Sequence, residues 1–331
     1  MTTSITVQTG STAGRSRRSQ QSAPDGSPSG WLRFFVALLI VVALFTWQGI
    51  ERRPTGSAGG IALNPPPAVE FQKTASTSGD RSLKATSPTA IADRAAIRIG
   101  TYNIHSGLGT DRQFDLSRIA ALLQTEDFVG LNEVRGGSWL SPTSQAELLA
   151  AQLQMPWLFA PTENQWWRGH FGNGALCRWP ISEWKRIPLS GTRSAGHRNA
   201  VVVTLSHPEK PLSILLTHLD REIDRAAQLK QITTLFLSLP QPAVLLGDLN
   251  TPRSDPLLAP LLSASDVEDA LAARLTGDPG DRIDWIVSRG LHCSAAGMVE
   301  AGPSDHPHFW AEFSWPGAKA EGAALPSGPE G

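Results

Sequence analysis

The fold is decided by residues 243–250, which read Ala-Val-Leu-Leu-Gly-Asp-Leu-Asn. Four apolar residues in a row predict a short buried strand, and the glycine, aspartate and asparagine that follow predict its end. Asp248 and Asn250 form turns after strands more often than they bind ligands. The loops after strands are, however, where a rigid scaffold presents functional side chains. This stretch alone leaves both interpretations open.

The same pattern recurs at two other predicted strands. Glu133 follows the apolar residues 129–131, and Thr217-His218-Leu219-Asp220 follows the apolar residues 214–216. In each case a buried strand ends and a carboxylate or an imidazole appears. Several such ends in one chain favour a shared site over unrelated turns.

Strands and helices are mixed along residues 96–316. Helices do not follow every predicted strand, so the pattern favours sheets packed together with helices outside them over a doubly wound sheet. Ser144 and Glu147 form a capping box for a helix through Leu153. The remaining predicted helices cover residues 116–123 and 224–237, and the remaining predicted strands cover residues 97–103, 173–177, 200–205, 282–287 and 309–313.

The first 95 residues do not have the composition of a globular domain. Residues 1–30 are rich in Ser, Gly, Gln and Arg and predict a disordered segment. Residues 31–50 hold an uncharged apolar run and approach the roughly 20 residues that a transmembrane helix needs. A signal peptide cleaved near residues 56–58 is the alternative to this anchor. Residues 51–95 predict a Pro/Ser/Gly/Ala-rich linker, and residues 317–331 predict a disordered tail.

Flanking charge sets the expected orientation of the membrane segment. Positive charge is retained on the cytoplasmic side, so the N-terminus is expected in the cytoplasm and residues 96–316 outside it. The bias is modest: Arg15, Arg17, Arg18 and Arg33 precede the apolar run, and Arg52 and Arg53, offset by Glu51, follow it.

Charge and cysteine content exclude some classes of protein. The formal net charge of the chain is −1, so no strongly basic field holds nucleic acid non-specifically, which argues against a generic DNA-binding role without excluding a nuclease. Cys177 and Cys293 lack metal-ligand spacing. We expect two buried thiols; a disulfide is the alternative in an oxidising compartment.

Six short motifs span nearly all of residues 96–315. They are Thr101-Tyr102-Asn103-Ile104-His105, Leu131-Asn132-Glu133-Val134, Thr217-His218-Leu219-Asp220, Gly247-Asp248-Leu249-Asn250, Arg282-Ile283-Asp284-Trp285-Ile286 and Ser304-Asp305-His306-Pro307. Together, and in this order, they resemble the endonuclease/exonuclease/phosphatase superfamily, which includes deoxyribonuclease I and exonuclease III. The resemblance implies a four-layer α/β sandwich with two central mixed β-sheets.

The resemblance also implies a divalent cation, Mg²⁺ or alternatively Mn²⁺. A phosphoester is negatively charged and repels a water nucleophile, and a bound cation offsets that charge. Mg²⁺ takes oxygen ligands and keeps several waters, so a few side chains suffice. By resemblance, Glu133 is the principal metal ligand, Asn103 lies close by, and Asp305 adds to the metal shell.

The remaining motif residues are implied to carry the reaction itself. Asp248 would orient or deprotonate the attacking water, and Asn250 would hold a phosphate oxygen. Asp284 would fix the ring of His306, which would stabilise or protonate the phosphoryl oxygens. His218 would assist the leaving group or the phosphate. An imidazole suits either role because its ordinary pKa is about 6.5.

Three features have two interpretations each. Asp220 either joins the site or only caps the turn after it. Arg225 and Gln228 lie one helical turn apart and either face the site or support it from behind. The aromatic residues 166–174, with Trp139 and Trp157 before them, either contact substrate or pack in the core.

The sequence therefore predicts a monomeric, membrane-anchored, Mg²⁺-dependent phosphoester hydrolase. The expected substrate is a nucleic acid, a phospholipid or a small phosphate ester, so phosphodiesterase, nuclease and phosphatase activities remain open. The alternative is a membrane-tethered binding module on an inactive hydrolase scaffold. A serine hydrolase is discounted because the chain has no Gly-x-Ser-x-Gly nucleophile elbow.

Overall fold

The structure is a computed structural model that describes residues 30–50, 53–60, 96–138, 141–164, 170–191, 196–208, 210–272, 274–275 and 281–316. The predicted disordered N-terminus, most of the linker and the tail lie outside these residues, as do Trp139 and residues 165–169 of the aromatic stretch. The chain divides into two units, residues 1–46 and residues 47–331.

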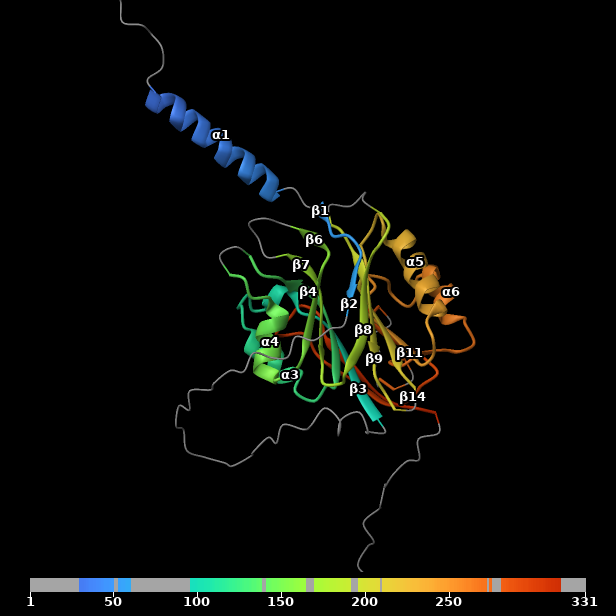
Figure 1. Cartoon of the computed structure of the whole chain (residues 1–331). Helices are drawn as coiled ribbons and strands as arrows, with labels where there is room; N and C mark the ends of the chain where they lie inside the picture. Colours follow the sequence, from blue (N-terminus) through green and yellow to red (C-terminus); the bar gives the residue numbers. More distant parts are fainter. Residues whose placement is uncertain are drawn as a thin grey trace, which may run out of the picture. The chain divides into compact units, whose positions relative to one another are not determined.

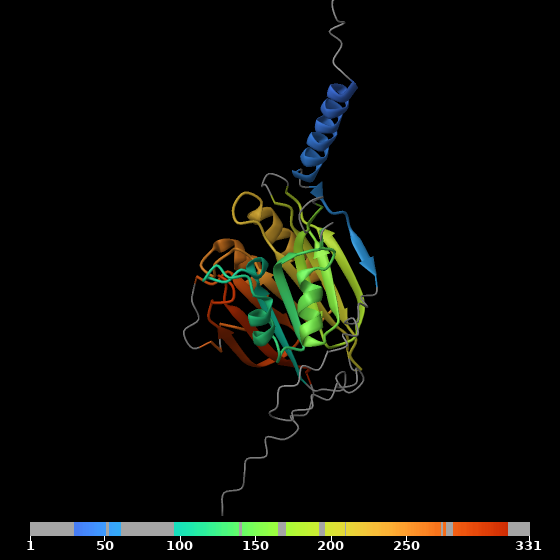
Figure 2. The same ribbon diagram turned by 90° about the vertical axis from the view of Figure 1, so that its left-hand side faces the viewer.

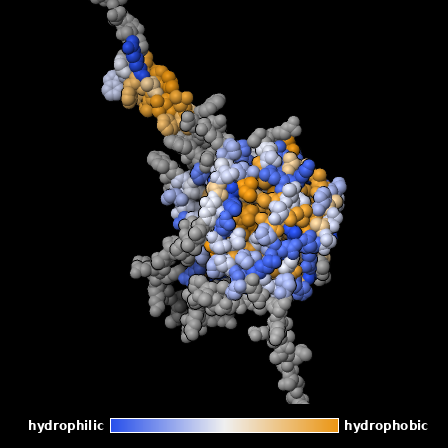
Figure 3. Space-filling model, turned by 45° about the vertical axis from the view of Figure 1, so that its right-hand side comes forward, coloured by the Kyte–Doolittle hydropathy of each residue, from blue (hydrophilic) through white to orange (hydrophobic). Residues whose placement is uncertain are grey.

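Helix α1 (Gly30–Ile50) is the described element of the first unit. Its large apolar side chains from Trp31 to Phe45 are exposed, and apolar residues cover most of its surface in Figure 3. None of the helices in the described part of the chain combines the length and the apolar character that crossing a membrane requires. The transmembrane helix expected over residues 31–50 is therefore not confirmed.

Two mixed β-sheets pack face to face in the second unit, with helices on their outer faces (Figures 1 and 2), as predicted. The seven-stranded sheet has the order β12 (Val267–Asp269), β13 (Asp284–Arg289), β11 (Ala243–Asp248), β10 (Leu212–His218), β9 (Asn199–Leu205), β8 (Ile181–Pro188) and β2 (Ala58–Gly60). The six-stranded sheet has the order β14 (His292–Val299), β15 (His308–Ser314), β3 (Ala96–Asn103), β4 (Phe128–Arg135), β7 (Phe171–Cys177) and β5 (Trp157–Pro161).

Apolar side chains from both sheets fill the space between them. Ile99, Val244 and Phe309 belong to this central cluster and are almost completely buried. The backbone of β4 comes so close to the other sheet at Gly130 that a Cβ there would lie 2.2 Å from Leu246 Cδ1. A side chain at this position would displace the ends of Leu246 and Leu216, so glycine allows the two sheets to pack closely here.

The helices bury one face each against the sheets (Figure 1). Helices α3 (Leu116–Leu122) and α4 (Gln145–Leu153) pack on the six-stranded sheet, and the Ser144 side chain accepts a hydrogen bond from the Glu147 N–H (3.1 Å), as the capping box predicts. Helix α5 (Arg225–Ser238) covers the seven-stranded sheet, with α6 (Ala259–Leu262) beside it. The short helices η1 (His105–Gly107) and η2 (Pro256–Leu258) complete the list of helices in the described residues.

The strand register brings the polar strand ends together. Strands β10 and β11 are parallel, and His218 is opposite Asp248. Strands β11 and β13 are antiparallel, and Asp248 is opposite Asp284. Strand β3 runs parallel to β4 in the other sheet and ends at Asn103, opposite Asn132. Polar residues that are far apart in sequence thus meet at one edge of the two sheets.

Residues 53–60 form strands, although their composition indicates a linker. Strand β1 (Arg53–Pro54) pairs with β6 (Glu163–Asn164), and β2 pairs with β8. Between them Thr55 is 6% exposed, and its hydroxyl donates a hydrogen bond to the Pro161 carbonyl (2.7 Å). This segment is therefore part of the folded domain.

Both cysteines are buried free thiols, as expected. Cys177 lies in β7 and Cys293 in β14, and neither forms a disulfide. Burial raises the pKa of both thiols, that of Cys293 to about 11, so they are protonated at neutral pH and poor nucleophiles.

Replacing Gly247 by Ala should destabilise the domain by roughly 3 kcal/mol or more. Gly247 has a φ of +129°, and a Cβ there would lie 1.9 Å from the Thr217 carbonyl oxygen of the neighbouring strand. Urea unfolding of the full chain measures the change. Gly302→Ala is the control, because no atom lies within 4 Å of its Cβ position. Equal stability of the two variants would contradict this account of the β11 end.

Candidate active site

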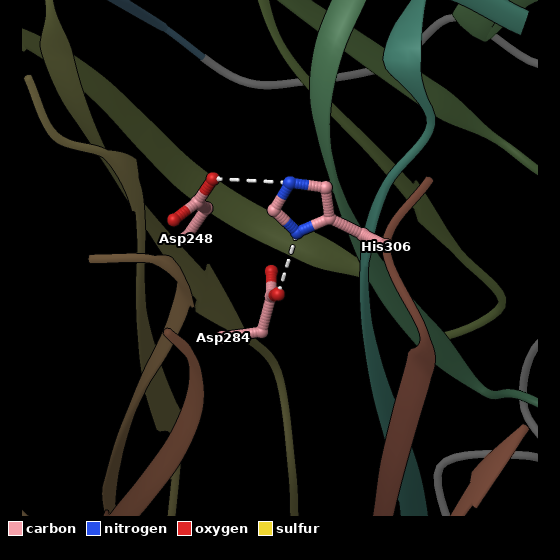
Figure 4. Close-up of side chains that lie close together, drawn as sticks. All are labelled: Asp248, Asp284 and His306. Atoms are coloured by element: carbon pink, nitrogen blue, oxygen red, sulfur yellow. Dashed lines mark hydrogen bonds and ion pairs between the residues drawn. The ribbon is translucent and has the colours of Figure 1, made fainter. Parts of the chain in front are cut away.

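Two aspartates of the seven-stranded sheet and His306, from the loop before β15, form a relay at the strand ends (Figure 4). Asp284 is the first residue of β13, and its Oδ2 lies 2.7 Å from the ring Nδ1 of His306. The other ring nitrogen, Nε2, lies 3.9 Å from Oδ2 of Asp248, the last residue of β11. Both aspartates are almost completely buried. The imidazole is thus held between two carboxylates.

Three hydrogen bonds fix Asp248. The Asn103 side-chain amide donates to Asp248 Oδ2 (3.1 Å), and the Asn250 backbone N–H donates to Oδ1 (2.8 Å). The Asp248 backbone N–H in turn donates to the side-chain oxygen of Asn132 (2.9 Å). Asn103 and Asn132 come from the six-stranded sheet, so the carboxylate is positioned by both sheets.

The pKa values of Asp248 and His306 are both raised above their ordinary values. Burial, supported by the negative charge of Asp284, raises the pKa of Asp248 to about 7. Burial lowers the pKa of His306, but the hydrogen bond to Asp284 and the nearby negative charges outweigh burial and raise it to about 9. At neutral pH the site therefore holds a proton on His306 beside a carboxylate that accepts one more readily than an exposed aspartate does.

His218 is a buried, neutral imidazole next to this relay. It is 2% exposed, and its Nε2 lies 3.4 Å from Asp248 Oδ2. Burial holds its pKa well below the ordinary value, and the positive charges of Arg198 and His306 lower it further. Neither ring nitrogen has a hydrogen-bond partner among the described residues. A buried polar group without a partner is costly, so this ring is available to a ligand.

Asn250 and the residues behind it hold the turn after β11. The Asn250 side-chain amide donates to the Leu219 carbonyl (2.9 Å), which uses one of its two N–H donors. Arg225 donates to the Asn250 carbonyl (2.8 Å), and Gln228 accepts from the Asp220 N–H (2.8 Å). Asp220 caps its own turn by accepting from two backbone N–H groups. Of the two interpretations of Arg225, Gln228 and Asp220, the supporting role agrees with these contacts.

Two predicted metal ligands make no described contact with the relay. Glu133 lies where the pairing of β4 with β7 shifts register, has a φ of 57°, and is partly exposed. Its carboxylate forms no hydrogen bond or ion pair with any other described residue. Asp305 precedes His306, and its half-exposed side chain lies 3.5 Å from His105 Nδ1.

These residues fit a hard cation. Among the described residues, Glu133 offers an uncommitted carboxylate, and the Asn103 side-chain oxygen accepts only from the His105 backbone N–H (3.1 Å); Asp305 offers a half-exposed carboxylate. Oxygen donors of this kind suit Mg²⁺. Asp248, Asp284 and His306 also have ligand atoms within 4.8 Å of one another. In this second group, however, the His306 Nδ1 is hydrogen-bonded to Asp284, and the Asp248 carboxylate accepts hydrogen bonds from Asn103 and Asn250. We therefore interpret these three residues as a proton relay.

Several residues that support the site are not among the candidates identified from the sequence, although Asn132 stands in one of the motifs. The Asn132 side chain donates to Asn173 (2.8 Å), and Asn173 donates to Asn199 (2.9 Å), which forms a buried chain of amides from β4 through β7 to β9. Arg198 precedes β9 beside Asn199. The signal in the sequence is an Arg-Asn pair at the start of a buried strand.

Replacing Asp284 by Asn should lower the pKa of His306 from about 9 toward or below its ordinary value, because burial is then opposed by less negative charge. NMR titration of the imidazole in EDTA measures this. Because the pKa of His306 is higher in the folded state than in the unfolded state, protonation of His306 stabilises the fold. This stabilisation is complete below about pH 6.5 and is lost as the pH rises through about 9. The free energy of unfolding of the wild type should therefore fall over this range, and less so in the variant. An unchanged His306 pKa would contradict the relay.

Comparisons with known proteins identify the family and the fold of the chain. The endonuclease/exonuclease/phosphatase family model matches residues 100–306, which include every predicted site residue. No curated protein matches the chain.

Solved structures share the fold at low identity. An endonuclease/exonuclease/phosphatase from Beutenbergia cavernae is 21% identical, with 68% of this chain and 73% of that chain covered and a TM-score of 0.56. The human Nocturnin catalytic domain with bound sulfate is 19% identical (66% and 93% covered, TM-score 0.52). D. rerio TDP2 complexed with a single-strand DNA product is also 19% identical (67% and 100% covered, TM-score 0.51). The chain belongs to the endonuclease/exonuclease/phosphatase family, a family of metal-dependent phosphoester hydrolases.

Proposed function

We propose that this chain is a Mg²⁺-dependent phosphoester hydrolase in which a water molecule attacks phosphorus. The observation that carries the proposal is the relay in which His306 lies between Asp284 and Asp248. It provides a proton acceptor and a proton donor in one buried site. General acid and base groups of this kind contribute roughly 10²–10⁴-fold each to the rate of such reactions.

The cation would be held by Glu133, Asn103 and Asp305. When bound, Mg²⁺ neutralises phosphate charge and stabilises the leaving oxygen. Mn²⁺ is the expected substitute, since it also takes oxygen ligands.

The side chains of the relay have distinct roles in the proposed reaction. Asp248 orients the attacking water and accepts its proton, because its Oδ2 faces the site and its pKa is raised to about 7. His306 is protonated at neutral pH and donates a hydrogen bond or a proton to a phosphoryl oxygen. Asp284 keeps the ring oriented. His218, being neutral, contacts the phosphate or the leaving group without adding charge.

A substrate panel tests the proposal. Full-length protein in detergent is assayed with bis(p-nitrophenyl) phosphate, p-nitrophenyl phosphate, single-stranded DNA and phospholipid vesicles, each with Mg²⁺, with Mn²⁺ and with EDTA. Single-stranded DNA is included because one similar structure holds such a product. We expect turnover of at least one substrate that EDTA abolishes. Folded protein that turns over none of them with either metal would favour the binding module instead.

We also propose that helix α1 anchors the chain in a membrane, with the hydrolase domain on the extracytoplasmic side. The proposal is supported by the exposed apolar side chains from Trp31 to Phe45 and by the arginines that precede them. Extraction of membranes with alkaline carbonate should leave the chain in the pellet, and protease added to intact spheroplasts should degrade the domain. Release by carbonate, or protection from protease, would contradict the anchor or its orientation, respectively.

A further inference from the structure

Arg198 is a largely buried arginine at the start of β9. Its backbone carbonyl accepts a hydrogen bond from the Leu189 N–H (3.0 Å), which fixes the chain directly before the strand. Its guanidinium carbon lies 5.8 Å from the centre of the Phe171 ring, and Phe171 in turn lies against His218, with 6.4 Å between the ring centres. The guanidinium is thus positioned beside the candidate active site.

The positive charge of Arg198 has no partner among the described residues. Its Nε is completely buried without a hydrogen bond, and the guanidinium forms no ion pair within 4.0 Å in the described part of the chain. Other buried arginines are paired: Arg282 with Asp269, and Arg289 with Asp266. Burying a charge without a partner is costly, so the contrast of Arg198 with Arg282 and Arg289 indicates a role outside its own packing.

The electrostatic surroundings of Arg198 point to the site. Burial lowers its pKa, and the carboxylates of Glu133, Asp248, Asp220 and Glu163 oppose this from beyond ion-pair distance. In the proposed function Glu133 binds the cation and Asp248 faces the water. Asp220 already accepts from two backbone N–H groups, and Glu163 accepts from the His197 N–H (3.0 Å). None of these four carboxylates forms an ion pair with the guanidinium, and their combined attraction does not outweigh the effect of burial on its pKa.

We propose that Arg198 binds the phosphoryl group of the substrate directly, together with the neutral ring of His218. This inference rests on the proposed phosphoester hydrolysis. A guanidinium presents several N–H donors in one plane and matches two phosphate oxygens at once. The unpartnered nitrogens of His218 supply a further contact without competing charge. Arg198 thereby contributes a fixed positive charge on the β9 side of the site.

The test compares Arg198→Met with Arg178→Met in the full chain. Arg178 is the matched control, because it lies outside the site and donates to the backbone carbonyls of Glu126 and Gln124. Inorganic phosphate is the probe. Three quantities are measured: the thermal midpoint without phosphate, its shift when phosphate is added in EDTA, and kcat/KM with Mg²⁺ on the substrate that the panel identifies.

A ligand-binding role predicts a specific combination of results. Arg198→Met should keep or raise the thermal midpoint without phosphate, because it removes an unpaired buried charge. It should lose the stabilisation by phosphate and lower kcat/KM by roughly 10²–10³-fold, the usual cost of removing one donor to a developing oxyanion. Arg198→Lys should recover part of the loss, since charge returns without the planar fork. Arg178→Met should keep wild-type phosphate stabilisation and kcat/KM.

Other outcomes overturn the inference. If Arg198→Met lowers the thermal midpoint and keeps the phosphate shift, the side chain is structural. If wild-type protein hydrolyses its substrate and the variant matches it in kcat/KM and in phosphate binding, Arg198 does not contact the phosphoryl group. If wild-type protein has no activity yet shows an Arg198-dependent phosphate shift, the proposed hydrolysis fails and the anion site stands.

Discussion

Replacing Asp248 by Asn is expected to lower kcat by roughly 10³-fold or more, which is the largest single effect on the chemistry that we predict. The carboxylate loses its ability to take a proton, and it stops supporting the positive charge on His306 that lies 3.9 Å away. Asparagine is nearly the same size, so the loss is chemical and not a cavity effect. Its oxygen keeps the hydrogen bond from the Asn250 N–H.

The matched control for this prediction is Asp111→Asn. Asp111 is an exposed aspartate that pairs with Arg118 outside the site, and its replacement should change kcat by less than a factor of about 2. Steady-state kinetics with saturating Mg²⁺ separates kcat from KM for both variants. Circular dichroism and thermal unfolding verify that both are folded. If a folded Asp248→Asn protein retains wild-type kcat, the role of the relay is disproved.

Replacing Glu133 by Gln is the second variant with a large expected effect. Its carboxylate is the one predicted metal ligand without a hydrogen bond or ion pair among the described residues. Removing its charge should raise the Mg²⁺ concentration that gives half-maximal activity by roughly 100-fold or more, since even outer-shell changes cost 10–100-fold. The fold should be little affected, because this side chain forms no hydrogen bond or ion pair with a described residue. Mg²⁺ titration of activity and Mn²⁺ binding followed by electron paramagnetic resonance measure the change.

The same titration distinguishes the two groups that fit a metal. If the cation is held by Glu133, Asn103 and Asp305, Asp284→Asn lowers kcat and leaves the Mg²⁺ titration nearly unchanged. If the cation lies instead among Asp248, Asp284 and His306, Asp284→Asn shifts the Mg²⁺ titration and Glu133→Gln does not. The second pattern would assign the relay to metal binding.

Much of the fold is predictable because it depends on local patterns. Buried strands such as β10 and β11 are uninterrupted apolar runs, and their polar ends mark where they stop. Strand β8 is not predicted, because its exposed and partly buried residues, such as Glu183 and Lys185, carry no apolar alternation. Residues 53–60 are not predicted either, because their pairing depends on strands more than 100 residues away.

The motif residues of the candidate site are identified from the sequence, but their contacts and the residues around them are not. Motif order identifies Asp248, Asp284 and His306, and strand register then brings them together. The sequence cannot show that Asn250 uses its amide on the Leu219 carbonyl. Nor can it show that Arg198 lacks a partner, since the pairing of a charge depends on side chains from distant strands. Such features follow from tertiary geometry alone.

In the proposed reaction the site directs water to phosphorus. Hydrolysis of the active p-nitrophenyl ester in ¹⁸O-labelled water with Mg²⁺ tests it most directly, with mass spectrometry of both products. We predict that the label appears in the phosphate product of the wild-type chain, and that Asp248→Asn forms this labelled product roughly 10³-fold more slowly. Label in the p-nitrophenol, or label in the phosphate at an equal rate with Asp248→Asn, would contradict the account.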